Sequence, residues 1–306
     1  MLLIDSITKD LSPWIEALKN ELGEEKVVTW EEVEDPSTIT VAVVWNHRPE
    51  LFASLPNLRL VASLGAGVDH ILRDKLLPPD MPVSKVISHH LSGPMANFCI
   101  GAVMYFHRQF DKYAVDKGNR NWDQQFDPEI PVKIGILGLG TIGQELAKRL
   151  VALDFEVAGL SRSQKNIPGV QCFDEEGIHD FLAGTNMLIS MLPHTPETEG
   201  MLNKELFNKM PKGSYLINVG RGKQQVDEDI LECLDNGQLA GAFLDVFPEE
   251  PLPQNSPMWD HPKVFITPHI AVVTKLEAAV PQIAENFKRL ERGEPLINLI
   301  DREKGY

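Results

Sequence analysis

Cysteine, basic residues and long apolar runs are all scarce in this chain of 306 residues. The three cysteines, Cys99, Cys172 and Cys233, lie far apart and are odd in number. Neither a disulfide framework nor a metal-site spacing follows from them, and a reducing cytoplasm is the simplest setting. No run approaches the roughly twenty apolar residues of a membrane span. The opening MLLIDSITKD also lacks the basic region of a signal peptide, so we expect a cytoplasmic protein.

Positive charge is in short supply. The chain has 29 lysines and arginines against 44 aspartates and glutamates, for a net charge of −15 and an isoelectric point near 5.0. This balance argues against nucleic acid or an anionic membrane as a partner. An acidic protein that binds an anionic substrate must gather its few cations locally. Isolated arginines and histidines close to glycine loops are therefore the candidates to examine.

One stretch near the middle predicts a strand, a glycine turn, a helix and a second strand. Apolar runs at Ile134–Leu137 and Phe155–Leu160 flank an amphipathic segment. The first glycine of a GxGxxG motif allows a tight turn, the second lets a pyrophosphate approach, and the third lets the helix pack on the strand. We therefore predict dinucleotide binding, with a glycine-rich turn in an ordinary α/β core as the alternative. The motif is Gly138-Leu139-Gly140-Thr141-Ile142-Gly143.

The end of the second strand indicates which dinucleotide. An NAD site usually carries an acidic residue about twenty positions after the glycines, where it holds the ribose 2′-hydroxyl. Here the chain has Ser161-Arg162-Ser163 with Lys165 just beyond. This turn has no carboxylate that would repel a 2′-phosphate, and the guanidinium of Arg162 could bind that phosphate. The sequence favours NADP(H) and leaves NAD(H) binding open; a solvated basic turn is the alternative.

Residues 1–92 alternate apolar runs with helical segments, which is typical of a parallel sheet covered on both faces. Gly65-Ala66-Gly67 directly follows a strand and could offer backbone N–H groups to a carboxylate, or be a plain turn. Trp45 ends another strand and could border a substrate or cap the core. The expected helix is Leu11–Leu22. The expected strands are Leu2–Asp5, Lys26–Thr29, Thr40–Trp45, Arg59–Leu64 and Val83–Ser88.

Residues 93–118 predict one long helix, whose apolar stripe is typical of a core or a subunit interface. The neighbouring pair His89-His90 suggests a metal site at first sight. Adjacent histidines on a strand point to opposite faces, which argues against that interpretation.

Polar residues follow the later predicted strands. Arg221 lies between two glycines, where an anion-binding role explains it better than solubility. His269 alone is best interpreted as a core histidine, but together with Arg221 and Glu250 it forms a convergent set. A helix from Leu276 to Leu290 should start or kink at Pro281. The strands concerned are Met187–Met191, Tyr215–Val219, Gly241–Val246 and Val264–Thr267.

The chain resembles the D-isomer-specific 2-hydroxyacid dehydrogenases over nearly its whole length, and most closely the bacterial glyoxylate/hydroxypyruvate reductases. The resemblance implies a fold of two Rossmann-like parallel-sheet α/β domains. A flavodoxin-like substrate domain would take residues 1–93 and 273–306, and an NAD(P)-binding domain 94–272. It also implies a homodimer formed through the cofactor domain. The matching stretches are SLGAGVDHIL, GILGLGTIGQELAKRL, SRSQK, LPHTPETEGMLN, LINVGRGKQQVDEDIL, GAFLDVFPEEPLPQNSPMWDHP, ITPHIA and DREKGY.

The resemblance also implies residue roles. Arg221 would hold the carboxylate and carbonyl oxygen of the substrate, Glu250 would hydrogen-bond His269, and His269 would protonate the carbonyl oxygen as hydride arrives. Negative charge on that oxygen needs a cation and a proton donor. The substrate would also contact Trp45, Gly65, Ala66 and Gly67. The cofactor would be lined by Gly138 to Gly143, Ser161, Arg162, Ser163, Pro193, Thr198, Val219, Gly220 and Asp245.

The implied reaction is NADPH-dependent reduction of small 2-oxoacids, glyoxylate and hydroxypyruvate, to glycolate and D-glycerate. Two alternatives remain at this point: another dehydrogenase of the family, such as one of phosphoglycerate type, and a non-catalytic corepressor that senses dinucleotides. One departure from the family is Asn97, where Glu is common.

Overall fold

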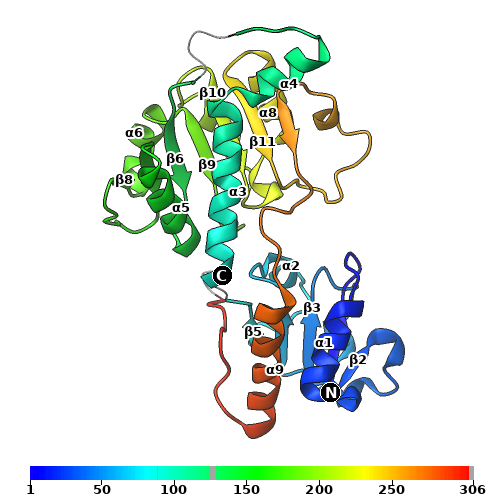
Figure 1. Ribbon diagram of the computed structural model, residues 1–306. Helices are drawn as coiled ribbons and strands as arrows, with labels where there is room; N and C mark the ends of the chain where they lie inside the picture. Colours follow the sequence, from blue (N-terminus) through cyan, green and yellow to red (C-terminus); the bar gives the residue numbers. More distant parts are fainter. Residues whose placement is uncertain (88, 125–128, 303–306) are drawn as a thin grey trace. The chain divides into compact units, whose positions relative to one another are not determined.

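The computed structural model describes residues 1–87, 89–124 and 129–302 (Figure 1). The chain divides into two compact units, Met1–His89 with Thr274–Tyr306, and His90–Val273. Each unit is built on a sheet whose paired strands run parallel. The predicted fold class, two parallel-sheet α/β domains, is confirmed. Within the described residues no helix is long and apolar enough to cross a membrane.

The first unit has the strand order β2-β1-β3-β4-β5. Apolar runs without alternation form these strands, as expected where both faces of a sheet are buried. The last strand is shorter than predicted and ends at Ser84, and residue 88 lies outside the described part of the chain. The bounds are β1 (Leu2–Asp5), β2 (Val27–Thr29), β3 (Val41–Val44), β4 (Leu60–Ser63) and β5 (Val83–Ser84).

Helices cover both faces of this sheet. Leu2 and Ile4 point to the face covered by α1 (Ser12–Leu22) and α9 (Leu276–Arg292), while Leu3 points to the other face, towards α2 (Asp69–Leu72). The alternation along β1 thus separates two hydrophobic clusters. Helix α9 begins at Leu276 and contains Pro281, so a start at the proline was a wrong alternative.

The second unit has the strand order β12-β11-β10-β9-β6-β7-β8. The order reverses between β6 and β9, and ligands of such sheets bind where it reverses, beyond the carboxyl ends of the strands. Strand β8 was not predicted, because its residues are only partly buried at a sheet edge. The bounds are β6 (Lys133–Leu137), β7 (Glu156–Leu160), β8 (Val170–Phe173), β9 (Met187–Ser190), β10 (Ser214–Asn218), β11 (Leu239–Leu244) and β12 (Val264–Ile266).

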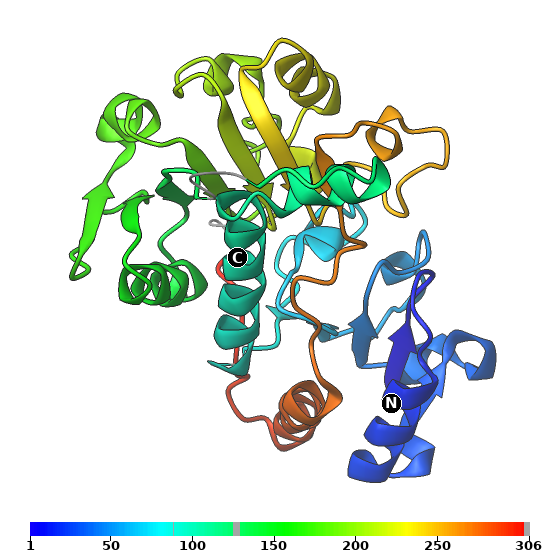
Figure 2. The same cartoon turned by 45° about the horizontal axis from the view of Figure 1, so that its top comes forward.

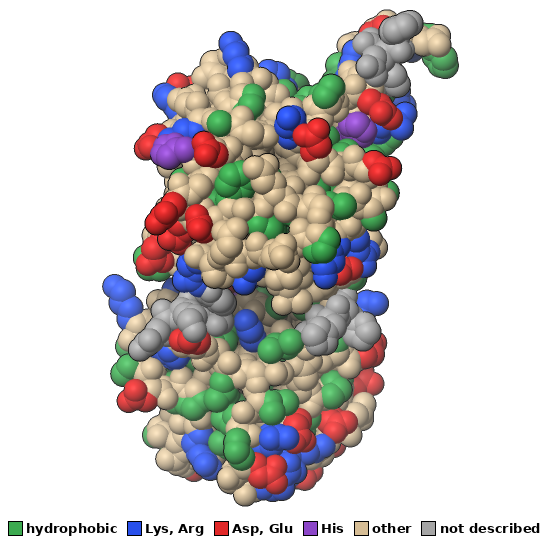
Figure 3. Space-filling view, turned by 90° about the vertical axis from the view of Figure 1, so that its left-hand side faces the viewer, with side chains coloured by type: hydrophobic (Ala, Val, Ile, Leu, Met, Phe, Trp, Pro, Cys, Tyr) green, Lys and Arg blue, Asp and Glu red, His purple; other side chains and the backbone are tan. Residues whose placement is uncertain are grey.

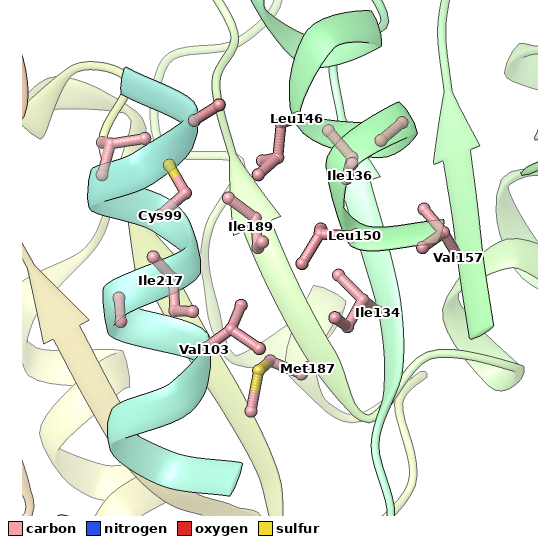
Figure 4. Packing of buried hydrophobic residues seen from close by; sticks show 14 of the residues in the cluster. Cys99, Val103, Ile134, Ile136, Leu146, Leu150, Val157, Met187, Ile189 and Ile217 are labelled. Atoms are coloured by element: carbon pink, nitrogen blue, oxygen red, sulfur yellow. The ribbon is translucent and has the colours of Figure 1, made fainter. Parts of the chain in front are cut away.

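Two layers of helices enclose the second sheet. Ile134 and Ile136 face α3 (His89–His107) and α5 (Thr141–Ala152), as the close view in Figure 4 shows. Leu137 and Leu216 belong to the opposite cluster, which contains residues of α6 (Ile178–Ala183), α7 (Lys204–Phe207) and α8 (Asp227–Asp235). The β6–α5–β7 unit predicted around the glycine motif is present, with α5 on one face of the sheet.

The long helix predicted over residues 93–118 is wrong as a single element. Helix α3 ends at His107, and α4 (Phe110–Gly118) runs in a different direction (Figure 2). Between them Gln109 has a left-handed φ of 55°. The ring of Phe106 packs on Tyr215 near the start of β10, with 4.7 Å between centroids. Tyr215 lies near the start of its strand, so a helix continued beyond Phe106 would no longer pack on the sheet. Phe110, in the next helix, is accordingly 53% exposed.

The beginning of α3 bears on two predictions. His89 is the first residue of this helix and does not lie on a strand. The prediction against a metal site assumed that His89 and His90 lie on a strand, and that assumption was wrong. The side chains of these two histidines are outside the described part of the structure. The side-chain oxygen Oδ1 of Asn97 accepts a hydrogen bond from Nη1 of Arg149 in α5 at 2.7 Å. Arg149 also pairs with Glu145, so the amide lies in a polar contact between α3 and α5.

Candidate active site

The loops that follow adjacent strands of the second sheet carry most of the predicted site. All these strands are parallel, so their carboxyl ends meet at one edge. The glycine motif follows β6, the loop with Pro193 and Thr198 follows β9, and Arg221 follows β10. Glu250 comes after β11 and His269 after β12. Residues up to 131 positions apart, from Gly138 to His269, are thereby placed along one edge.

His269 and Glu250 form a close pair. The Nδ1 atom of His269 lies 2.7 Å from Oε2 of Glu250. The other carboxylate oxygen, Oε1, accepts a hydrogen bond from the Phe247 N–H at 3.0 Å. Both side chains are about one-third exposed, at 34% and 36%. Because a carboxylate only accepts hydrogen bonds, Nδ1 must carry the proton that it donates to Glu250. The other ring nitrogen, Nε2, is then available to contact a ligand.

Opposing effects act on the ionisation of Glu250. Burial alone would raise the pKa of this carboxyl group. The hydrogen bonds from His269 and from the Phe247 N–H outweigh burial, and the positive charges of His269 and Arg221 add to them, so that the pKa of Glu250 is lowered. Arg221 follows β10, the strand next to the one that precedes Glu250, and its charge contributes to the lowering. The three residues of the predicted catalytic set are therefore brought together.

Backbone contacts fix the position of Arg221. Its Nη1 atom donates to the Gly220 carbonyl at 2.8 Å, and its own N–H donates to Oε1 of Gln224 at 3.1 Å. The next residue, Gly222, lies against the backbone of Phe247, where an added Cβ would overlap the main chain. Only glycine lets the loop after β10 lie this close to the loop after β11. That approach places Arg221 near Glu250.

Asp245, at the end of β11, is almost fully buried, with 1% exposure. Its carboxylate accepts hydrogen bonds from Thr267 Oγ1, the Ile270 N–H and the Ala271 N–H at 2.7, 2.8 and 2.9 Å. Its carbonyl accepts the His269 N–H at 2.8 Å. His269 has a φ of 53°, which is unusual for a residue with a side chain. Asp245, predicted to line the cofactor, thus directs both carboxylate oxygens to the segment that carries His269.

The glycine turn has the features that a pyrophosphate requires. Gly138 has a φ of 105°, which only glycine adopts without strain. A Cβ at Gly140 would meet no atom within 4 Å, so the space beside it is open to a ligand. No described side chain caps the N-terminus of α5, whose first N–H groups lack partners within the helix. These residues fit a dinucleotide.

The remaining predicted cofactor residues lie at the ends of β7, β9 and β10. Arg162 is exposed, and its charge contributes to lowering the pKa of Glu197, after hydrogen bonds to Thr195 and the backbone of Glu197 itself. The Ser161 hydroxyl donates to the Ser163 carbonyl at 2.9 Å. The Thr198 hydroxyl donates to the Pro193 carbonyl at 2.8 Å and so closes that loop. Val219 and Gly220 are buried behind Arg221.

The predicted substrate residues of the first unit lie at the ends of β3 and β4. The Trp45 ring lies so close to Gly65 that an added Cβ would be 2.8 Å from its Cζ3 atom. The Gly65 N–H donates to Ser63 Oγ at 3.1 Å, and this hydroxyl donates to the Gly67 carbonyl at 2.7 Å. Gly65 therefore uses its N–H within the loop. Among the described residues, the N–H groups of Ala66 and Gly67 meet no acceptor.

Sequence reasoning missed one group in each unit. Gln224 is fully buried and contacts two loops, although glutamine is usually exposed and its sequence position gives no signal. The Lys9 ammonium lies 4.1 Å from the centroid of the Trp45 ring. Lys9 could have been predicted to lie near Trp45, because it follows β1, and the ends of β1 and β3 are adjacent in the sheet.

The chain is similar to known proteins over its whole length. Residues 100–271 match the family model of the D-isomer specific 2-hydroxyacid dehydrogenase, NAD binding domain. A glyoxylate/hydroxypyruvate reductase of Sinorhizobium meliloti, described as NADPH-dependent and crystallised with NADP and sulfate, is 37% identical with a TM-score of 0.90. The comparison covers 100% of this chain and 99% of that one.

Two further structures agree over the same extent. A D-isomer specific 2-hydroxyacid dehydrogenase of Xanthobacter autotrophicus Py2, in complex with NADPH and MES, is 36% identical with a TM-score of 0.89. A probable 2-hydroxyacid dehydrogenase of Rhizobium etli CFN 42, in complex with NADP, HEPES and L(+)-tartaric acid, is 35% identical with a TM-score of 0.85. Both cover 100% of this chain and 99% of their own. The resemblance drawn from the motifs is confirmed: the chain belongs to the D-isomer-specific 2-hydroxyacid dehydrogenase family.

Proposed function

We propose that this dehydrogenase reduces glyoxylate and hydroxypyruvate to glycolate and D-glycerate with NADPH. The observation that carries the proposal is the His269–Glu250 pair beside Arg221, at the same sheet edge as the glycine turn. The Sinorhizobium meliloti relative, named for this activity, supports the choice of substrates.

The chain's own residues divide the work of reduction. When bound, the reduced nicotinamide supplies the hydride for the carbonyl carbon. Arg221 binds the substrate carboxylate and carbonyl oxygen through its planar fork of donors. His269 delivers a proton from Nε2 to the carbonyl oxygen as negative charge develops there. Glu250 orients the ring through Nδ1 and stabilises its protonated form. One hydride and one proton convert the carbonyl group to a hydroxyl group.

The first unit would act as the substrate domain, and the second as the cofactor domain. We propose that the Ala66 and Gly67 N–H groups bind the substrate carboxylate and that Trp45 borders the substrate. Gly65 contributes chiefly by its small size, because it seats the Trp45 ring and donates its N–H to Ser63. This refines the sequence prediction, in which all three N–H groups served the substrate.

The preference for NADPH is assigned to the turn after β7. Arg162, with Ser161 and Ser163, would bind the 2′-phosphate, since no carboxylate ends this strand. Binding of NADP by the Sinorhizobium and Rhizobium relatives supports this assignment. The remaining cofactor contacts would come from Gly138 to Gly143 and from the loops with Pro193, Thr198, Val219, Gly220 and Asp245.

We further propose a homodimer formed through the second unit. Helix α4 and the segment after it expose large apolar side chains: Phe110 is 53% exposed, Val115 52% and Trp122 93%. Figure 3 shows exposed hydrophobic side chains among the charged ones on the surface of this unit. Large apolar side chains exposed on one segment are candidates for burial against a second copy of the chain.

A substrate panel tests the proposal. The oxidation of NADPH and NADH is followed by absorbance with glyoxylate, hydroxypyruvate, pyruvate and 3-phosphohydroxypyruvate. We expect the largest kcat/KM for NADPH with glyoxylate or hydroxypyruvate. Preference for 3-phosphohydroxypyruvate would instead indicate a phosphoglycerate-type enzyme, and a clear NADH preference would refute the role of Arg162. Cofactor binding without any turnover would favour the corepressor alternative.

A further inference from the structure

Gln224 is a buried side chain with an unusual number of partners. It is 0% exposed and lies two residues after the glycine that follows Arg221. Its Nε2 atom donates to the carbonyls of Leu192 and Pro193 at 3.0 and 2.9 Å. Its Oε1 atom accepts the Arg221 N–H at 3.1 Å and the Ser190 hydroxyl at 3.3 Å. Both donors and the acceptor of the amide are therefore in use.

The partners of this amide belong to two loops of the active site. Leu192 and Pro193 lie in the loop after β9, beside the glycine turn: a Cβ at Gly138 would lie 3.2 Å from the Leu192 side chain. The Oε1 atom of Gln224 accepts the N–H of Arg221, which lies in the loop after β10. One side chain thus joins the segment assigned to the cofactor with the backbone of the arginine assigned to the substrate.

We propose that Gln224 is a positioning residue for the reaction. It fixes the distance between the Arg221 guanidinium and the loop that lines the cofactor, and so holds the substrate in register with the nicotinamide. The expected effect on turnover of a 2-oxoacid rests on the proposed function, while the expected effect on NADPH binding can be tested without a substrate. Loss of the amide leaves the Leu192 carbonyl and the Arg221 N–H without their partner and removes one of two donors to the Pro193 carbonyl, and both loops can then relax. Small displacements of reacting groups lower rates strongly.

A second glutamine provides a matched control. Gln238 precedes β11, and its Nε2 atom donates to the carbonyls of Phe207 and Met210 at 2.7 and 3.1 Å. It therefore binds backbone carbonyls in the same way, but at the amino end of the sheet, away from the loops of the site. A purely structural role predicts similar consequences for both residues.

The test compares Gln224→Met and Gln238→Met, which preserve side-chain length and remove the amide. Four quantities are measured: the melting temperature, the Kd of NADPH from nicotinamide fluorescence without substrate, and KM and kcat for the 2-oxoacid. We expect both variants to melt at lower temperature. Only Gln224→Met should raise the Kd of NADPH, about threefold to tenfold, and lower kcat/KM by roughly ten- to a hundredfold.

Kinetic constants and a Kd for Gln224→Met within twofold of the wild type, with a lower melting temperature, would overturn the proposal. Equal kinetic losses in Gln238→Met would overturn it as well. If Gln224→Met does not fold, Gln224→Asn keeps the amide but shortens it, and should change the Kd of NADPH and kcat/KM in the same direction. If the chain turns over none of the 2-oxoacids, the proposed function fails, but the Kd comparison still decides the role of Gln224.

Discussion

The carboxyl edges of the two sheets are built in different ways. At the edge of the second unit, charged side chains protrude and buried polar groups hold their loops: Asp245 holds the segment of His269, and Gln224 holds Arg221. At the edge of the first unit, shape and backbone dominate, with Trp45 resting on Gly65 and a short loop closed by Ser63. Chemistry on a carbonyl needs groups that carry charge and protons, whereas recognition of a carboxylate needs only N–H groups and a wall.

The comparison predicts a division of kinetic effects. Removal of His269 or Arg221 at the edge of the second unit should lower kcat/KM by about a hundredfold or more, through kcat or through KM. Substitutions at the edge of the first unit should raise KM only several-fold and leave kcat unchanged. Each of the following experiments sharpens or breaks this division.

The largest effect is expected for His269→Ala. Removal of the proton donor should lower kcat about a thousandfold, because general acid catalysis of this kind contributes that order of rate enhancement. The Kd of NADPH should stay unchanged, since the imidazole acts on the substrate. Steady-state kinetics and a fluorescence titration measure the two quantities. A kcat within tenfold of the wild type would remove His269 from the role of acid.

Arg221→Ala should come next. Loss of a charged donor pair should reduce kcat/KM for glyoxylate by about a hundredfold, mostly through KM. Lys223→Ala is the matched control, because Lys223 is an exposed cation two residues away. It should leave kcat/KM unchanged. Equal losses in both variants would show that general positive charge, not the placement of Arg221, binds the substrate.

Gly65→Ala tests the first unit. The new Cβ would lie 2.8 Å from the Trp45 ring and must displace it, which should cost about 1–3 kcal/mol of unfolding free energy. We expect KM to rise several-fold with kcat retained. Gly101→Ala is the control, because its Cβ would meet no atom within 4 Å on an exposed part of α3; it should stabilise the protein by about 0.5–1 kcal/mol. A fall in kcat with unchanged KM in Gly65→Ala would contradict the division.

Glu250→Gln should have the smallest effect at neutral pH and a clear effect on pH dependence. Without the carboxylate, the protonated form of the His269 ring loses its partner, so the upper pH limit of reduction should move to lower pH. The pH–rate profile of kcat measures this. A profile that coincides with that of the wild type would remove the proposed role of Glu250.

The same substitution makes a prediction for stability. The pKa of Glu250 is lowered in the folded state, so ionised Glu250 stabilises the fold above its unfolded pKa of about 4.3. This contribution is lost as the pH falls through the lower, folded pKa. The difference in unfolding free energy between wild type and Glu250→Gln should therefore shrink between pH 6 and pH 3. A difference that grows on acidification would show that burial of the carboxyl group prevails.

The sequence predicted those parts of the fold that depend on local pattern. Uninterrupted apolar runs such as Ile134–Leu137 become central strands because both faces of a parallel sheet are buried. Strand β8 lacks that signal because it is a partly buried edge strand. The break at Gln109 was missed because it occurs where α3 reaches the end of the sheet, which no local propensity encodes.

The site divides along similar lines. That Arg221, Glu250 and His269 lie along one sheet edge could be predicted, because each follows a strand of the same parallel sheet. The supporting roles of Asp245 and Gln224 could not, because they depend on burial of a polar group among backbone atoms from other strands. The engagement of the Gly65 N–H by Ser63 is likewise a property of the folded loop.

A crystal structure with NADPH and oxamate, an unreactive 2-oxoacid analogue, tests the central claim most directly. The account predicts that the oxamate carboxylate pairs with the Arg221 guanidinium and that its carbonyl oxygen lies about 3 Å from Nε2 of His269. Oxamate bound away from both residues, with the nicotinamide ring in place, would contradict it.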